Sequence, residues 1–367
     1  MKSYRIAILI FTALLLGGTL RLYFAYNVAA RPDEDAYLAP ARVMREHIEE
    51  GELDKIPDVD VTWEHPQLVK LMFSLTLDEG DMNEIPTKIV PGKTTPLPEH
   101  SLRNSRLQTI AVSVLTLFTV ALTSPLAALL LAIDPIHFQF GSTAYIDAMP
   151  TLFTALMAYF YVRAEHNMRR FLLSGVCLGV AVACKYPYAW IGVILVMHML
   201  VYRAFSLKHI FLWGMLALAV FYLLNPYIWE NPIERVYDQL TFHEAYADAQ
   251  LEKDNHALLK PIDQLTEPRY YLPSKVKHEI WNPLGKLVFA LAIPGTAVLL
   301  YEKSFYGWWM VLGLLFLMVW PTQWIQHNMM IVVPYTLAAA TGLRWLWQRI
   351  TLRIRQPVTD HAAGHSL

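Results

Sequence analysis

Three consecutive carboxylates, Asp33, Glu34 and Asp35, follow directly after the first apolar segment of the chain. A charge at the mouth of a membrane helix is costly, so it is usually paired or functional. One such carboxylate can act as a general base, which takes the proton of an acceptor hydroxyl while the oxygen attacks a reactive carbon. The alternative is that the triplet is only the solvated start of a loop.

Glu64 and His65 form a second polar pair, immediately before Pro66. Proline is favoured at the first position of a helix, so the pair is expected at a helix start. It could bind a metal ion, hold a sugar, or simply cap the helix with an exposed imidazole. Together with Glu34 and Asp35, the pair would offer oxygen and imidazole ligands to a divalent ion. Whether the protein binds a divalent metal ion therefore stays open, and no other cofactor is expected.

Basic residues complete the set. Arg103 and Arg106 precede the second apolar segment, and Lys185 is a basic residue within a long apolar region. A guanidinium can bind two phosphate oxygens at once, and a lysine within a membrane is rare and usually functional. We expect these three residues to bind phosphate, the alternative for the arginines being interfacial snorkelling. Asp147 and His327 begin apolar segments at the same face and are added as substrate-binding candidates.

The composition is that of a membrane protein. The chain has 367 residues, of which 55% are hydrophobic and 17% charged, and its mean hydropathy is +0.32. A soluble domain carries about 25% charged residues. The net charge of −1 and the absence of a nucleic-acid-binding motif argue against a nucleic-acid partner. The partners expected instead are the lipid bilayer and small or lipid-linked substrates.

Apolar segments of membrane-spanning length recur along the chain. A helix needs about 20 apolar residues to cross a bilayer, which predicts about ten spans. They lie near residues 5–26, 105–122, 125–140, 147–164, 171–185, 187–203, 208–226, 283–301, 306–322 and 328–348. We therefore predict an all-α integral membrane protein, with one domain over residues 1–350 and a cytoplasmic tail without fixed structure over 351–367. The third and fifth segments are short and are expected to be broken or partly re-entrant.

Lysine and arginine set the orientation, because they concentrate in cytoplasmic loops. Basic residues cluster at the N-terminus, at 163–170, at 203–208 and from 344 onwards, whereas the long segments 27–104 and 227–282 are acidic. These two segments are therefore predicted to be outer loops. The first should contain two amphipathic helices lying in the membrane interface. Their apolar residues are Tyr37, Leu38, Ala41 and Met44 within 36–48, and Leu68, Leu71, Met72 and Leu75 within 66–77.

Carboxylates and basic groups thus converge at one membrane face. Transfer from a lipid-linked phosphosugar needs this combination, because a carboxylate activates the acceptor while cations stabilise the departing phosphate. A non-catalytic transporter of a lipid-linked sugar would place its charges near the midplane, where this chain has few. An assembly subunit with an inactive enzyme fold is the other alternative.

At these residues the chain resembles the GT-C glycosyltransferases, most of all the protein O-mannosyltransferase family (glycosyltransferase family 39) and its prokaryotic relatives. That family has an Asp-Glu pair after the first span, similar to Asp33-Glu34, and a His-Pro-Pro-Leu-Gly-Lys stretch, similar to residues 65–70. Further similar positions are Arg106, Ile133-Asp134-Pro135, Asp147 and Gly179 to Tyr186, and a Pro-x-x-Trp stretch and a late Gln-His pair also match in kind.

The resemblance implies the GT-C fold and an inverting, one-step transfer of a hexose, with mannose as the expected sugar, from a polyprenyl- or dolichyl-phosphate sugar. Asp33 would be the base, Glu34 would support acceptor or sugar binding, and Arg106 and Lys185 would contact the lipid phosphate. The acceptor implied is a protein Ser or Thr hydroxyl. Gln67 and Val69 replace a proline and a glycine of the family stretch, so a lipid or cell-envelope glycan is the second choice.

The resemblance also implies a location. The site would face outwards from a prokaryotic plasma membrane, or the lumen of the endoplasmic reticulum in a eukaryote.

Overall fold

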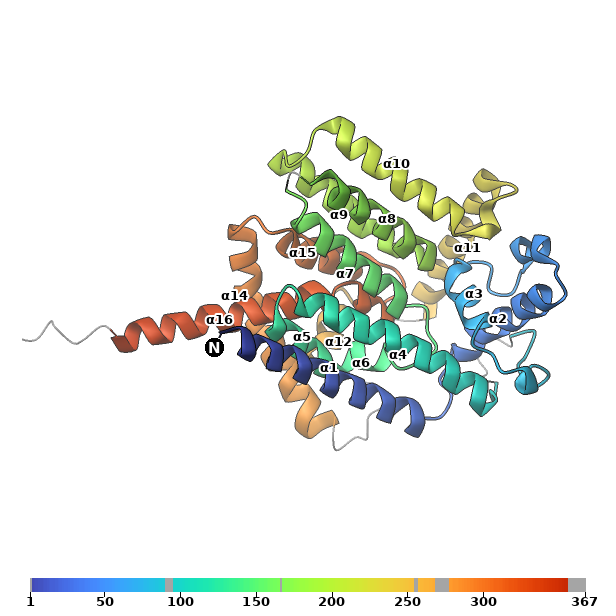
Figure 1. Ribbon diagram of the computed structural model, residues 1–367, viewed down its shortest axis with the longest axis horizontal. Helices are drawn as coiled ribbons and strands as arrows, with labels where there is room; N and C mark the ends of the chain where they lie inside the picture. The colour runs from blue at the N-terminus through green and yellow to red at the C-terminus, as the bar shows by residue number, and fades with distance from the viewer. Residues whose placement is uncertain (1, 90–94, 166, 254–256, 268–276, 356–367) are drawn as a thin grey trace, which may run out of the picture.

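The computed structural model describes residues 2–89, 95–165, 167–253, 257–267 and 277–355, and within these ranges all the regular secondary structure is helical (Figure 1). The predicted all-α class is confirmed for this part of the chain. The longer helices are α1 (Lys2–Asn27), α2 (Glu34–Glu49), α3 (Leu68–Ser74), α4 (Glu99–Ala121), α5 (Pro125–Ile133), α6 (Pro135–Phe140), α7 (Ala148–Val162), α8 (Met168–Cys184), α9 (Ala189–Tyr202), α10 (Leu207–Leu223), α11 (Pro232–Lys253), α12 (Lys260–Thr266), α14 (Asn282–Tyr301), α15 (Phe305–Val319) and α16 (Val332–Arg355). Short 3₁₀ or π turns are η1 (Leu53–Asp58), η2 (Glu79–Asp81), η3 (Tyr186–Tyr188), η4 (Pro226–Ile228), η5 (Lys277–Trp281) and η6 (Ile325–Met330).

Each predicted apolar segment coincides with helical structure. The third one is broken as expected, whereas the fifth, which was also expected to be broken, is the continuous helix α8. The break lies at Asp134-Pro135, where α5 ends and α6 begins. Pro135 has no backbone N–H to continue the helix. The Asp134 carboxylate accepts a hydrogen bond of 2.8 Å from the backbone N–H of His137, which caps the new helix.

The long helices pack into a bundle whose outer surface is apolar. α1 packs against α4 and α5, α8 against α7 and α10, and α14 against α16. The last pair approaches closely, since a Cβ added at Gly295 would lie 1.8 Å from the carbonyl oxygen of Ala338. Large apolar side chains such as Phe11 and Leu15 on α1 and Phe211 on α10 face outwards. Such a surface suits contact with lipid rather than water.

Two described helices are long and apolar enough to cross a membrane, Tyr4–Asn27 and Glu279–Tyr301. Four shorter apolar helices accompany them: Ala148–Val162, Tyr186–Tyr202, Leu207–Leu223 and Phe305–Val319. The count of about ten spans stays a prediction.

The first outer loop contains the two predicted helices. In α2 the expected residues Tyr37, Leu38, Ala41 and Met44 are all buried. In α3 the buried residues are Val69, Lys70, Phe73 and Ser74, whereas Leu75 lies beyond the helix end and is exposed. Of the expected apolar residues, Leu68, Leu71 and Met72 are half-buried against hydrophobic clusters, and only Leu75 departs from the stripe. Lys70 was not expected on the inward side, where it donates hydrogen bonds to backbone carbonyls.

The second outer loop is also structured. α11 and α12 lie within it, and α11 is at the same end of the bundle as α2 and α3 (Figure 1). At the other end, α16 continues to Arg355, so residues 351–355 of the predicted tail are helical. Residues 356–367 lie outside the described residues.

Candidate active site

One cavity of about 380 Å³ lies where the outer segments meet. Its walls come from the start of α2, the turn before α3, the junction of α8 and α9, α11, and the segment between α15 and η6. The predicted site residues that line it are Asp33, Glu64, His65, Lys185 and His327. Segments far apart in sequence thus bring a carboxylate, a cation and imidazoles to one space.

Asp33 precedes α2 in a left-handed backbone conformation, with φ 72° and ψ −10°. A residue with a side chain adopts this conformation at a cost of roughly 1–3 kcal/mol, and such strain clusters at functional sites. Burial raises the pKa of the Asp33 carboxyl, and the neighbouring Asp35 and Asp147 raise it further, whereas Lys185 opposes the shift. A carboxylate with a raised pKa is a better proton acceptor.

Glu34 does not line the cavity and is fully buried. Its two oxygens accept hydrogen bonds of 2.8 and 2.6 Å from Nε and Nη2 of Arg106, a bidentate ion pair. The same oxygens accept backbone N–H groups of Ala144 and Arg31 at 2.8 and 2.7 Å. With all these donors, the Glu34 carboxylate is saturated and anchors the turn that carries Asp33.

The remaining N–H groups of Arg106 reinforce the same turn. They donate to the carbonyl oxygens of Ala25, Val28 and Ala29 at distances of 2.7–3.0 Å. Those carbonyls belong to the end of α1 and the turn that follows it. Arg106 therefore joins the first helix to α2 through Glu34.

Asp35 and Arg103 also lie apart from the main cavity. The Asp35 oxygens accept backbone N–H groups of Ala36 at 3.0 Å and Thr95 at 2.7 Å. Arg103 and Arg106 border a separate cavity of about 590 Å³ beside the end of α1. The structure therefore does not bring the two arginines together with Lys185.

Lys185 follows the last residue of α8, and its ammonium lies 2.6 Å from Oδ1 of Asp147. Both residues are buried, and Asp147 immediately precedes α7. Oδ2 of Asp147 has no hydrogen-bond partner among the described residues. Asp147 is thus placed behind Lys185 and fixes the ammonium at the cavity wall.

The sequence missed His243, together with its neighbours Phe242 and Tyr246, all on α11 and all lining the cavity. α11 is fixed to the first outer loop by hydrogen bonds from Gln239 Nε2 to the Trp63 carbonyl, 2.8 Å, and between His243 Nε2 and the Glu64 carbonyl, 3.1 Å. The spacing of 242, 243 and 246 on one helical face was the available signal.

Lys70 was also missed. It is buried, and its ammonium donates to the carbonyl oxygens of Thr62 and His65 at 2.5 and 2.9 Å. Thr62 has a φ of 53°, so this turn too is strained. Burial lowers the pKa of Lys70 to about 7, while Glu64 opposes that shift. The lysine holds the turn that presents Glu64 and His65 to the cavity.

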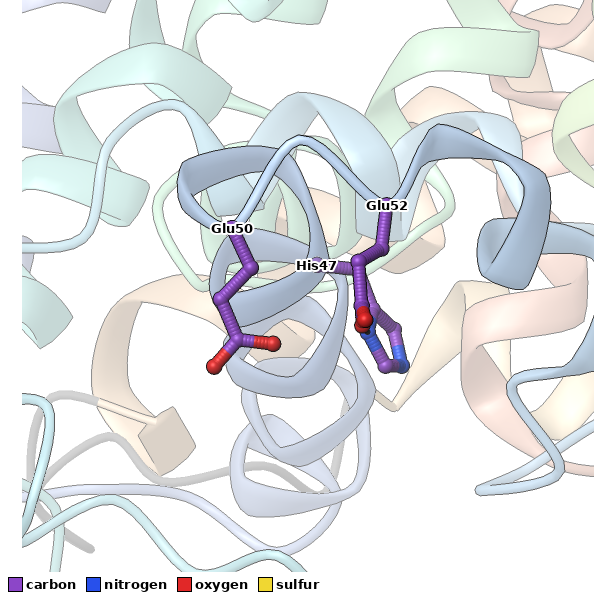
Figure 2. A group of neighbouring side chains, drawn as sticks. All are labelled: His47, Glu50 and Glu52. Carbon is purple, nitrogen blue, oxygen red and sulfur yellow. Dashed lines mark hydrogen bonds and ion pairs between the residues drawn. The ribbon is translucent and has the colours of Figure 1, made fainter.

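The four metal candidates, Glu34, Asp35, Glu64 and His65, do not form a cluster of ligands among the described residues. The set whose ligand atoms lie within 4.8 Å of one another there is His47, Glu50 and Glu52, at the end of α2 (Figure 2). The Lys55 ammonium lies 2.7 Å from Glu52, which opposes a dication. This set does not line the cavity of Asp33.

The fold is that of solved GT-C glycosyltransferases. ArnT from Cupriavidus metallidurans, solved bound to undecaprenyl phosphate, has a TM-score of 0.57 and 15% sequence identity, over 96% of this chain and 64% of that one. The oligosaccharyltransferase AglB from Archaeoglobus fulgidus, solved with an inhibitory peptide and a dolichol-phosphate, has a TM-score of 0.58 and 13% identity, over 100% of this chain and 53% of that one. The chain thus spans less than two thirds of either structure.

One segment also matches a family model. Residues 108–229, from α4 to just beyond η4, match the family described as dolichyl-phosphate-mannose-protein mannosyltransferase. No curated protein sequence matches the chain. The resemblance to GT-C glycosyltransferases is thereby confirmed.

Proposed function

We propose that the chain is an inverting membrane glycosyltransferase that moves a hexose, mannose in the first instance, from a polyprenyl- or dolichyl-phosphate sugar to an acceptor hydroxyl. The observation that carries the proposal is the presence of Asp33 and the Asp147-fixed Lys185 in one cavity. The family model and the lipid phosphates bound to ArnT and AglB support the donor class.

In the proposed reaction, Asp33 takes the proton of the acceptor hydroxyl while its oxygen attacks the anomeric carbon. The bond between that carbon and the phosphate oxygen breaks, and its electron pair leaves with the lipid phosphate. Attack opposite the leaving group inverts the configuration. The Lys185 ammonium stabilises the charge that develops on the phosphate.

Other polar residues act through these two. Glu34 and Arg106 hold the strained turn of Asp33, and Asp147 orients Lys185. Glu34, Arg106 and Asp147 do not line the cavity, so we propose that all three are positioning residues.

The acceptor proposed first is a protein Ser or Thr hydroxyl, on the outer face of a plasma membrane or in the lumen of the endoplasmic reticulum. The alternative acceptor is a lipid or cell-envelope glycan. It is favoured by Gln67 and Val69, which replace a proline and a glycine of the protein O-mannosyltransferase stretch.

A transfer assay tests the proposal. Purified protein in detergent is mixed with radiolabelled polyprenyl-phosphate mannose and a membrane-lysate acceptor pool, with Asp33→Asn as the control. We expect label in protein with the wild type and a loss of about 10²–10⁴-fold with the variant. Label in lipid would select the alternative acceptor, and equal turnover by Asp33→Asn would refute the assignment of the base.

A further inference from the structure

Two imidazoles of the cavity have a fixed arrangement of ring protons. His243 Nε2 lies 3.1 Å from the carbonyl oxygen of Glu64, and His327 Nδ1 lies 2.6 Å from that of Thr322. A carbonyl can only accept a hydrogen bond, so each of these nitrogens must carry a proton and donate. In a neutral ring, the other nitrogen then carries a lone pair.

The second nitrogen of each ring, Nδ1 of His243 and Nε2 of His327, can contact a substrate. His243 and His327 both line the cavity. Within the part of the chain that the structure describes, His243 Nδ1 and His327 Nε2 have no hydrogen-bond partner, and neither is sealed from accessible space. Each is therefore available as a hydrogen-bond acceptor when its ring is neutral.

The protonation state of His327 makes its imidazole select hydrogen-bond donors over acceptors. Burial lowers the pKa of His327 well below its usual value, and the nearby Lys185 lowers it further. A neutral imidazole whose N–H is already engaged can only accept. Phosphate oxygens are acceptors too, whereas sugar hydroxyls can donate.

We propose that His243 and His327 form a sugar subsite that accepts hydrogen bonds from hydroxyls of a neutral sugar, beside the phosphate contact at Lys185. This inference rests on the proposed function and narrows the donor sugars to neutral ones. The carboxylate of a uronic acid would face hydrogen-bond acceptors and would be repelled by the carboxylates of Asp33 and Glu64. Trp324 and Tyr246, which are 41% and 40% exposed, line the same cavity and offer apolar ring surface to a sugar.

Binding measurements separate the sugar from the phosphate. The affinity of purified protein is measured for undecaprenyl phosphate and for undecaprenyl-phosphate mannose, glucose, galactose and glucuronic acid. For the wild type we expect at least one neutral-sugar lipid to bind more tightly than undecaprenyl phosphate. The glucuronic-acid lipid should bind no more tightly than undecaprenyl phosphate. His327→Phe, which removes the nitrogens but keeps a ring, should weaken the preferred sugar lipid about 3–10-fold and leave undecaprenyl phosphate unchanged.

Three further variants sharpen the comparison. His243→Phe should behave like His327→Phe, and Lys185→Met should weaken both kinds of lipid. His209→Phe, on α10 and away from the cavity, is the matched control and should change neither. Unchanged binding of undecaprenyl phosphate shows that a histidine variant is folded, and an unchanged Tm shows it for Lys185→Met.

Two outcomes would overturn the inference. If His327→Phe weakened undecaprenyl phosphate as much as the sugar lipid, the imidazole would serve the phosphate. If no neutral-sugar lipid bound more tightly than undecaprenyl phosphate to the wild type, there would be no sugar-hydroxyl subsite, while the donor class would stand. Failure of the wild type to bind any of these lipids would instead refute the proposed function itself.

Discussion

At the scale of the residue, Asp33 combines a strained backbone with a carboxyl whose pKa is raised. A general base must be deprotonated, so kcat/KM should rise with pH through the pKa of Asp33 and reach its plateau above the range of an ordinary aspartate. Asp35→Asn removes one of the like charges that raise this pKa, while keeping an oxygen to accept the Thr95 N–H. The rising limb of the pH profile should then move to lower pH. A limb that stays in place would show that another group titrates there.

The ion pair of Glu34 and Arg106 gives a second residue-scale prediction. Glu34→Gln leaves the buried guanidinium without its counter-charge, which costs roughly 3–5 kcal/mol in comparable pairs. We therefore expect a lower Tm in detergent together with lower activity. Should Glu34→Gln abolish transfer with an unchanged Tm, Glu34 would act in the chemistry rather than in positioning.

At the scale of the element, sequence periodicity predicted helices well where one face is uniformly apolar. α2 has its buried face at Tyr37, Leu38 and Met44 as expected. In α3 the periodicity did not predict the burial of Lys70, because this burial depends on backbone carbonyls in a neighbouring turn. It also missed α11 and hence His243, since that helix is mostly polar and is held by Gln239 and backbone carbonyls of another loop.

The turn before α3 should depend on Lys70. Lys70→Met leaves the carbonyls of Thr62 and His65 without their donor, and each buried unpaired carbonyl costs about 1–3 kcal/mol. Because this turn presents Glu64 and His65 to the cavity, we expect kcat/KM to fall. Lys70→Gln, which retains N–H donors, should recover part of the loss. Michaelis parameters and Tm for both variants check this, and an unaffected kcat/KM in a folded Lys70→Met protein would contradict it.

At the scale of the whole molecule, the sequence placed Asp33, Glu64, Lys185 and His327 at one face, and the structure gathers them in one cavity. It did not foresee that Arg106 and Glu34 would neutralise each other inside the bundle. Residue types reveal which groups could carry charge at an interface. They do not reveal which of those charges fold against one another, because that depends on how α1, α2 and α4 pack.

The orientation of the bundle is the remaining prediction at this scale. Basic segments at one end and acidic outer loops at the other place Glu79 outside and Lys208 inside. Both positions are exposed, whereas the native Cys177 and Cys184 are buried and should not react. In sealed right-side-out vesicles, a membrane-impermeant maleimide should label Glu79→Cys directly, but Lys208→Cys only after permeabilisation. Because Asp33 lies at the end of the bundle that holds Glu79, the reverse pattern would put the cavity on the cytoplasmic side, where an outward-facing lipid-linked donor could not reach it.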